Sequence, residues 1–407
     1  MQRQILHIDV NNAFLSWTAV ERLKNGETLD IRTIPAIIGG DEEKRKGVVL
    51  AKSNIAKQFG IQTGEPIYFA RKKCPKIQIF ASNYSIYIKY SQAMHQIFSE
   101  YTPKIEQFSI DECFLDLTEY LPKGKTLLQI AYEINKRIYN ELNFTVNVGV
   151  AHNKLLAKMA SDFEKPNKVH TLWEEEIPEK MWKLPVGELF MVGRKSLPKL
   201  QKMGIKTIGD LANKQEQELI RYFGKYGKLI WEYANGIDLS EVKYEKENPK
   251  CIGNSITLPQ DCEDIEKLEE ILLMLVEQVT YRLRKQNLKA KVVNVQIKTN
   301  EFKVFSHQRK MEKYTDVTKY IYQEAKKLLK DLKINKPIRL IGIRVDDLSN
   351  EENSQISLFD IQTKENKKQE KIDKTLDKIK EKYGYNAIKR GGDININGII
   401  DLNKLEK

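Results

Sequence analysis

The run IEQFSIDECFLDL, residues 105–117, places two adjacent carboxylates, Asp111 and Glu112, among residues that favour β-strands. Successive side chains of a regular strand point to opposite faces of the sheet, so one acid of an adjacent pair would face a core. Burying an unpaired carboxylate is costly unless it finds a cation or a hydrogen-bonding partner. The run therefore predicts a strand, a turn and a second strand, with both acids near the turn, where they can point toward one site.

A third acid, Asp9, ends another predicted buried strand, QILHID, at residues 4–9. If this strand pairs with the strands at 105–117, three carboxylates meet at one edge of a sheet. Carboxylate oxygens of this kind hold pairs of magnesium ions about 3.5–4 Å apart in enzymes that act on phosphates. Acids at strand ends also cap turns separately, and the spacing alone leaves both interpretations open.

Hydrophobic periodicity predicts an α+β organisation for most of the chain. Three central strands are expected at residues 5–9, 105–117 and 145–150, and a smaller helical region follows from about residue 174 to 238. A second α+β unit is expected after residue 250, and the polar composition from residue 349 onward predicts a mobile tail. The other expected elements are strands at 34–40, 47–51, 78–80, 292–299 and 338–345, and helices at 14–24, 55–59, 84–101, 126–142, 155–162, 265–286 and 317–332.

The charge pattern favours a polyanionic partner. Net charge is +12, and the segment from Gln278 to Asn300 contains six basic residues and no acid. A helix face that is merely exposed to solvent usually has acidic residues among its basic ones, so we expect the partner to be a nucleic acid. No apolar run is long enough to cross a membrane, the N-terminus does not resemble a signal peptide, and the four scattered cysteines form no CxxC pattern. These features predict a cytoplasmic protein with no membrane contact.

Several motifs then occur in a fixed order: DVNNAFLS (9–16), NYSIYIKYS (83–91), FSIDECFLDLT (108–118), VNVGVAHNKLLAKMASDFEKPN (146–167) and the turn around 192–204. From about residue 4 to 345 the chain resembles a Y-family DNA polymerase, and more narrowly the bacterial polymerase IV/UmuC group of translesion enzymes. The resemblance implies a right-hand polymerase with palm sheet, small fingers, helix–hairpin–helix thumb and α+β little finger. The implied boundaries are palm 1–11 and 82–173, fingers 12–81, thumb 174–239, linker 240–249, little finger 250–348 and a mostly disordered tail 349–407.

By this resemblance Asp9, Asp111 and Glu112 are the catalytic metal ligands, and the backbone carbonyl of Val10 is a fourth ligand. Two Mg²⁺ ions would lie between them, with Asp9 and Asp111 bridging both. The ions would activate the primer 3′-hydroxyl, hold the incoming dNTP and stabilise the charge of the transition state.

The residues after Asp9 are expected to bind the nucleotide. Phe14 occupies the position of the family's steric gate, where a bulky ring under C2′ excludes the 2′-hydroxyl of a ribonucleotide; a core aromatic residue is the alternative. Backbone N–H groups of Asn12, Ala13 and Phe14, at a helix start, would cradle phosphates. Ala13 departs from the family, which usually has an aromatic residue there.

Three further polar residues are expected at the triphosphate. Lys165, in EKPN, matches a lysine that contacts the triphosphate in the family. Asn54 and Lys57 stand where many members have tyrosine and arginine. Lysine keeps the charge but loses the bidentate fork of arginine, and asparagine can still donate a hydrogen bond.

DNA contacts are expected in two places. The thumb hairpin, with Gly193, Arg194 and Lys195, would offer amides and basic side chains to phosphates, although a purely structural turn is the alternative. The little finger would contribute the basic residues Arg282, Arg284, Lys289 and Lys291.

The tail contains QISLF, residues 355–359, which resembles the pentapeptide that binds the bacterial sliding clamp; its expected contacts are Gln355, Ser357, Leu358 and Phe359. GGDEE, residues 39–43, is similar to a nucleotide-cyclase signature, but we interpret it as a hairpin turn. The resulting prediction is a monomeric, template-directed translesion polymerase. A catalytically silent DNA-binding scaffold with the same fold is the alternative.

Overall fold

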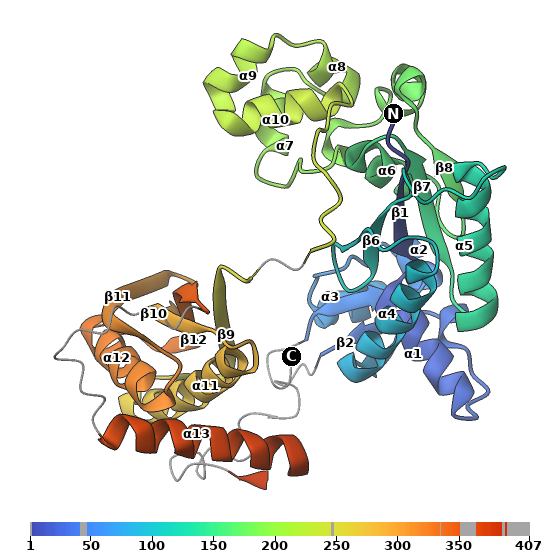
Figure 1. Cartoon of the computed structure of the whole chain (residues 1–407). Coiled ribbons are helices and arrows are strands. Elements are labelled where there is room, and N and C mark those ends of the chain that lie inside the picture. The colour runs from blue at the N-terminus through green and yellow to red at the C-terminus, as the bar shows by residue number, and fades with distance from the viewer. Residues whose placement is uncertain are drawn as a thin grey trace. The chain divides into compact units, whose positions relative to one another are not determined.

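The computed structural model describes residues 2–40, 47–245, 248–333, 335–350, 364–384 and 387–388. The chain forms two compact units, the first ending at Lys246 and the second beginning at Glu247 (Figure 1). This division falls within the stretch 240–249, where a linker was expected.

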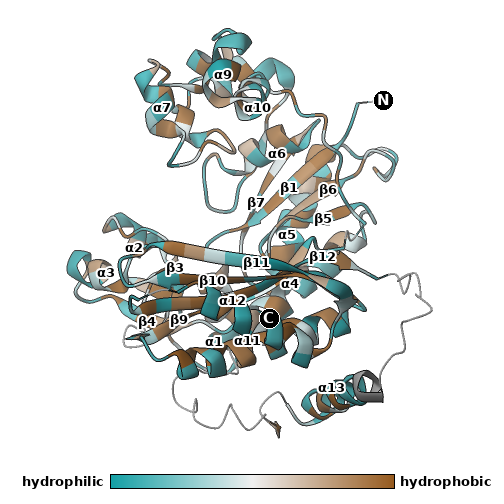
Figure 2. Cartoon of the chain, turned by 90° about the vertical axis from the view of Figure 1, so that its left-hand side faces the viewer, coloured by the Kyte–Doolittle hydropathy of each residue, from teal (hydrophilic) through white to brown (hydrophobic). Residues whose placement is uncertain are grey.

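A five-stranded sheet organises the first unit, in the order β5-β6-β1-β7-β8. The central strand β1 is antiparallel to both β6 and β7, and all of its residues are buried. Apolar residues at most positions explain this burial, although His7 and Asp9 are buried as well, and β1 and β7 are largely brown in Figure 2. The short strand β8 was not anticipated. The bounds are β1 Ile5–Val10, β5 Ile105–Gln107, β6 Glu112–Asp116, β7 Val146–Ala151 and β8 Val169–Thr171.

Helices cover both faces of this sheet (Figure 1). Leu6, Ile8 and Val10 of β1 pack in one cluster with residues of α4 (Tyr84–Ser99) and α5 (Leu127–Leu142). Ile5 packs in another cluster with α6 (Lys154–Ser161). Because side chains alternate along a strand, Asp9 lies on the α6 side, the side opposite to α4 and α5.

The predicted fingers are small. A three-stranded sheet, in the order β3-β2-β4, is accompanied by three short helices. Of these, α3 was not anticipated, and most of the GGDEE turn lies outside the described residues. The bounds are α1 Ala13–Lys24, β2 Ala36–Gly39, β3 Val49–Lys52, α2 Asn54–Gln58, α3 Ile67–Lys73 and β4 Gln78–Ala81.

The helical region completes the first unit. Its residues share an apolar cluster with α6, so it packs directly on the palm. Four α-helices follow three short helical turns (Glu174–Glu176, Ile177–Met181 and Val186–Glu188). The α-helices are α7 Leu197–Lys202, α8 Ile208–Ala212, α9 Glu216–Phe223 and α10 Lys225–Ala234.

The second unit is a four-stranded antiparallel sheet, in the order β11-β10-β12-β9, with α11 and α12 packed on one face. Two of its strands were not anticipated: β9 contains glycine and proline, and β11 is polar and exposed along nearly its whole length. The bounds are β9 Cys251–Cys262, α11 Ile265–Lys285, β10 Lys289–Thr299, β11 Val304–Thr315, α12 Thr318–Asp331 and β12 Ile338–Ser349.

Within the tail sequence, for which little structure was expected, a 20-residue helix is present, α13 (Lys364–Tyr383). Its docking residues are charged where an amphipathic helix normally has apolar ones, so hydrophobic periodicity did not reveal it. The α+β class and the polymerase-like architecture are otherwise as predicted. No helix among the described residues is long and apolar enough to cross a membrane.

Candidate active site

A cavity of about 330 Å³ lies at the carboxyl end of β1, between the palm and the small sheet that follows. It brings together nine residues that the sequence placed at the site. These are Asp9, Val10, Asn12, Ala13, Phe14, Asn54, Lys57, Asp111 and Lys165. The cavity is also lined by Lys52 and Asn11, which sequence analysis did not select.

The three acids converge because of strand register. Asp9 in β1 lies directly opposite Glu112 in β6, so their side chains share the α6 face of the sheet. Asp111 precedes β6, and its carbonyl accepts a hydrogen bond from the Val10 amide at 3.2 Å. Cys113, the next residue after Glu112, points into the core of α4 and α5. The adjacent acids therefore avoid that core because one lies before the strand and the other faces α6.

Lysines hold two of the carboxylates. Lys165 is paired with Asp9 and lies 2.9 Å from Asp162, and Lys158 lies 3.0 Å from Glu112. Asp111 instead accepts a hydrogen bond from the Ser109 hydroxyl at 2.6 Å.

Among the described residues, no three His, Cys, Asp or Glu side chains lie close enough to hold a metal ion as they stand. The donor set nevertheless fits a hard divalent cation, since it offers carboxylate and carbonyl oxygens that carry excess negative charge. Lys165 and Lys158 would exchange places with the metal at Asp9 and Glu112.

The pKa values reflect this buried charge network. Burial raises the pKa of Asp9 despite the opposing charge of Lys165. Burial also acts to raise the pKa of Glu112, but contacts with His7 and Lys158 outweigh it and lower the pKa to about 2. Burial lowers the pKa of His7, whose Nδ1 lies 2.7 Å from the Ser161 hydroxyl, so this imidazole is neutral at pH 7. Glu112 is thus held as a carboxylate.

Asn12 links the palm to the small sheet. It adopts a left-handed conformation (φ 49°) as the residue before α1, and its side-chain amide donates to the side-chain oxygen Oδ1 of Asn54 at 3.1 Å. The helix therefore begins at Ala13, and the first backbone N–H groups of α1 have no partner within the helix. This geometry suits an anion beside Ala13 and Phe14.

Phe14 is half-buried and forms part of the cavity wall. Its ring stacks on Tyr87 of α4 at a centroid distance of 4.5 Å and also contacts Tyr84 at 5.8 Å. Both alternatives from the sequence are therefore represented: the ring packs against the core and also borders the cavity. Packing against Tyr87 fixes the position of the wall.

Three lysines line the cavity: Lys52, Lys57 and Lys165. Burial and the nearby charge of Lys57 lower the pKa of Lys52. Clustered cations of this kind favour a bound polyanion. Lys52 follows directly on the predicted strand 47–51, and Lys158 precedes Asp162 by one helical turn. Their positions were visible in the sequence, but their proximity to the acids was not.

The thumb hairpin exposes its basic residues. Arg194 and Lys195 are exposed beside Gly193, whose amide donates to the Ser196 hydroxyl at 3.1 Å. Tyr226 of α10 donates to the Met191 carbonyl at 3.0 Å and so supports the turn.

The four basic residues expected in the little finger do not form one surface. Arg282 and Arg284 lie on α11, which covers the closed face of the sheet, whereas Lys289 and Lys291 begin β10. Arg284 is 11% exposed and its guanidinium is bound by Asp377 at 2.5 Å, so the prediction that it contacts phosphate is not supported. Arg282 donates to the Gly253 carbonyl at 2.7 Å. Gln355, Ser357, Leu358 and Phe359 lie outside the described residues.

Comparison with known proteins identifies the family of the chain. Residues 8–162 match the impB/mucB/samB family, residues 174–205 match the helix–hairpin–helix motif of the IMS family, and residues 249–358 match the family's C-terminal domain. A DNA polymerase IV from Clostridium acetobutylicum is 48% identical over 96% of this chain and 98% of that protein. A DNA polymerase IV from Acetivibrio thermocellus is 40% identical over 96% of this chain and 97% of that protein.

Among solved structures, a Y-family DNA polymerase chimera matches with a TM-score of 0.74 and 24% identity, over 84% of this chain and 98% of that one. The chain therefore belongs to the impB/mucB/samB family of Y-family DNA polymerases. It is a DNA-directed, translesion DNA polymerase, which acts on DNA and deoxynucleoside triphosphates with a divalent metal as cofactor.

Proposed function

We propose that this polymerase is a low-fidelity enzyme that transfers nucleotides by a two-metal mechanism with Mg²⁺. The observation that supports it best is the cavity at the end of β1, where Asp9 and Asp111 face three lysines and the ring of Phe14. Asp9, Asp111, Glu112 and the Val10 carbonyl would hold two Mg²⁺ ions. When bound, the ions supply charge stabilisation for the transferred phosphoryl group and activate the primer hydroxyl.

The chain's own residues bind and orient the nucleotide. Lys165, Lys57 and Lys52 neutralise the triphosphate, and the backbone amides at the start of α1 donate to its oxygens. Lys165 is paired with Asp9 in this structure, so it changes partner when a metal and a triphosphate enter. Asn54 supports this region through its hydrogen bond with Asn12, in place of the direct contact of a tyrosine.

Sugar selection is assigned to Phe14. Its ring is fixed by stacking on Tyr87, so it cannot swing aside at low cost to admit a 2′-hydroxyl. The thumb amides and side chains at Gly193, Arg194 and Lys195 bind phosphates, and Lys289 and Lys291 contribute from the second unit.

Primer extension with Mg²⁺ on undamaged and damaged templates tests the proposal. We expect template-directed extension, bypass of some lesions and a raised frequency of misincorporation. Accurate copying without misincorporation, or extension that does not depend on Mg²⁺, would contradict the proposal.

The QISLF segment supports recruitment of the polymerase by the sliding clamp. The polymerase would be monomeric and cytoplasmic. Leu358 and Phe359 are adjacent apolar anchors, each contributing about 1.5–3 kcal/mol before ordering costs. A variant with Leu358→Ala and Phe359→Ala should lose stimulation by the clamp and keep its clamp-free extension rate. A lower melting temperature with stimulation intact would show that the two residues pack on the polymerase itself.

A further inference from the structure

Buried charges anchor the C-terminal helix α13 to the second unit. Asp377 accepts hydrogen bonds from Arg284 Nε at 2.5 Å and Nη2 at 2.9 Å. Asp373 accepts from the Thr318 amide at 2.9 Å and thereby caps α12, whose own preceding residue provides no side-chain cap. Lys380 pairs with Glu277 at 3.1 Å, and both side chains are less than 10% exposed. The helix α13 is therefore held on α11 and α12, on the closed side of the sheet.

Helical geometry places a different set of side chains opposite this anchor. Asp373, Asp377 and Lys380 recur every three or four residues and so share one face of α13. A second set, also spaced by three or four residues, lies roughly half a turn away around the helix. This set, here called the basic ridge, consists of Lys371, Lys374, Lys378 and Lys382, all of them exposed.

The anchor leaves the ridge strongly positive. Asp373 and Asp377 face inward, where both contact Arg284, so they lie away from the lysines outside. Within the described part of the chain, none of the four ridge lysines is paired with a carboxylate. Glu370 and Glu381 lie near the ridge on α13, but two acids against its four lysines leave an excess of positive charge. An exposed row of like charges with such an excess is an electrostatic footprint for a polyanion.

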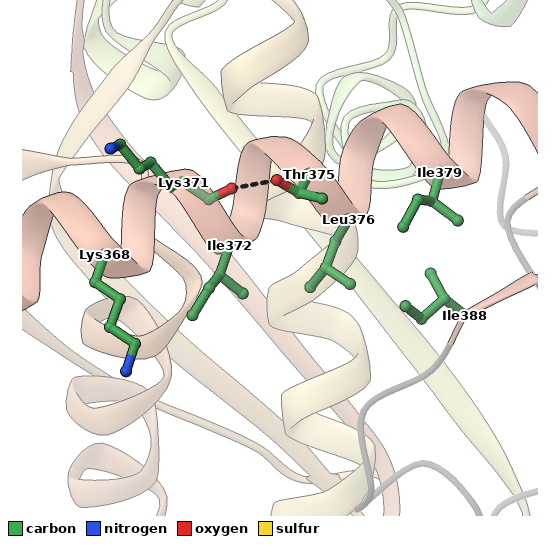
Figure 3. Close-up of a pocket in the computed structure, with 7 residues that line it drawn as sticks. All are labelled: Lys368, Lys371, Ile372, Thr375, Leu376, Ile379 and Ile388. Atoms are coloured by element: carbon green, nitrogen blue, oxygen red, sulfur yellow. Dashed lines mark hydrogen bonds between the residues drawn. The ribbon is translucent and has the colours of Figure 1, made fainter.

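An apolar groove beside the ridge distinguishes this helix from one that binds membranes. Ile372, Leu376 and Ile379 line a cavity of about 530 Å³ together with Ile388 (Figure 3). The groove lies between the anchor and the ridge, and Lys371 points to the other side of the helix from Ile372 (Figure 3). A membrane-bound helix instead exposes a broad apolar face opposite its charges. Figure 2 shows the mixed teal and brown colouring of α13.

We propose that the basic ridge is a second DNA-binding surface, which contacts phosphates without reading sequence. From Lys371 to Lys382 the ridge spans about 17 Å at the helical rise of ~1.5 Å per residue. A single DNA strand presents about five phosphates over that length, since they are spaced by ~3.4 Å along a duplex. In the proposed function, DNA is held by Lys289 and Lys291 of the sheet, whereas the ridge lies beyond α11 and α12, on the closed side of that sheet. The ridge therefore binds DNA outside the segment held at those two lysines.

The test compares short and long primer–templates bound to the full-length protein. The ridge variant combines Lys371→Gln, Lys374→Gln, Lys378→Gln and Lys382→Gln, and the matched control replaces the same four lysines with arginine. Affinity is measured against salt concentration on a duplex of about one helical turn and on one of about four turns, a turn being ~10 base pairs.

On the long duplex, the glutamine variant should lower the salt slope by roughly 2–4, since each lost phosphate contact contributes ~0.9. On the short duplex, its affinity and extension rate should match the wild type, and the arginine control should match throughout. An unchanged slope on the long duplex, or an equal fall on both duplexes, would overturn the proposal. The proposal would also be overturned if the glutamine variant kept its DNA affinity but lost binding to phosphatidylserine vesicles, because the ridge would then bind a membrane.

Discussion

The ion pair beside the catalytic acids of the palm is largely covered by protein, whereas an ion pair on the sheet of the second unit faces solvent. Lys158 and Glu112 are 9% and 20% exposed, but Arg309 and Asp331, paired at 3.0 Å in the second unit, are each 44% exposed. Water screens the exposed pair, while the buried pair must satisfy its charges within the protein. The buried pair in the palm therefore fixes the positions of its charges, whereas the exposed pair in the second unit mainly contributes to the surface field.

The largest expected effect is on catalysis in the palm. Asp111→Ala should reduce extension to less than about a tenth of wild type, because it removes a ligand that both ions would share. DNA affinity should stay within a few-fold, and the melting temperature should hold, since among the described residues the Asp111 side chain is hydrogen-bonded only to Ser109 of its own turn. Extension above that level would contradict the two-metal assignment.

The contrast between buried and exposed pairs can be tested by stability. Lys158→Met should lower the free energy of unfolding by about 3 kcal/mol, because it leaves Glu112 buried without its cation. Arg309→Met, the matched exposed variant, should cost less than about 1 kcal/mol. The double variant Lys158→Met, Glu112→Gln should recover part of the lost stability but should not recover activity. Equal losses for the two single variants, measured by chemical denaturation, would remove the distinction between the buried and the exposed pair.

The same buried pair predicts a pH dependence. The pKa of Glu112 is lowered from 4.5 to about 2 in the folded protein. Its ionised form therefore stabilises the fold fully above pH 4.5, and this contribution is lost as the pH falls toward 2. The difference in unfolding free energy between wild type and Glu112→Gln should be constant near neutral pH and shrink over that acidic range. A constant difference throughout would show that Glu112 has an ordinary pKa.

Phe14 tests the role of packing at the cavity wall. Phe14→Ala should lower discrimination against ribonucleotides by about tenfold or more, because it opens space beneath C2′. Ordinary extension should be largely kept. Tyr87→Phe is the matched control, since it keeps the stacked ring. Unchanged discrimination would mean that Phe14 is only a core residue.

The smallest effect is expected at the start of β10. Replacing Lys289 and Lys291 with glutamine should reduce the salt slope of DNA binding by at most about 1.8, from two phosphate contacts. Arg284→Gln should instead lower the melting temperature, because Arg284 holds α13 through Asp377. A larger change in salt slope for Arg284→Gln than for the lysine pair would place DNA, not α13, at this arginine.

The sequence by itself determined the polymerase fold and most of the cavity. Its motifs placed Asp9, Asp111, Phe14 and Lys165 together, because strand ends and helix starts are set by local residue patterns. The strands β1 and β7 were equally visible, since most of their residues are apolar, as is usual for strands buried on both faces.

Only the tertiary structure decided which charges meet. Strand register and helix packing bring Lys158 beside Glu112 and Lys52 beside Lys57. Register and packing leave no distinct pattern in the local sequence, so these contacts could not be predicted from it. Arg284 belonged to a basic run in the sequence, yet Asp377, 93 residues later, neutralises it. The helix α13 docks through charges that hydrophobic periodicity cannot detect. The hydrophobic pattern of a sequence indicates which side chains are exposed to water, but which distant charges form ion pairs depends on the folded geometry.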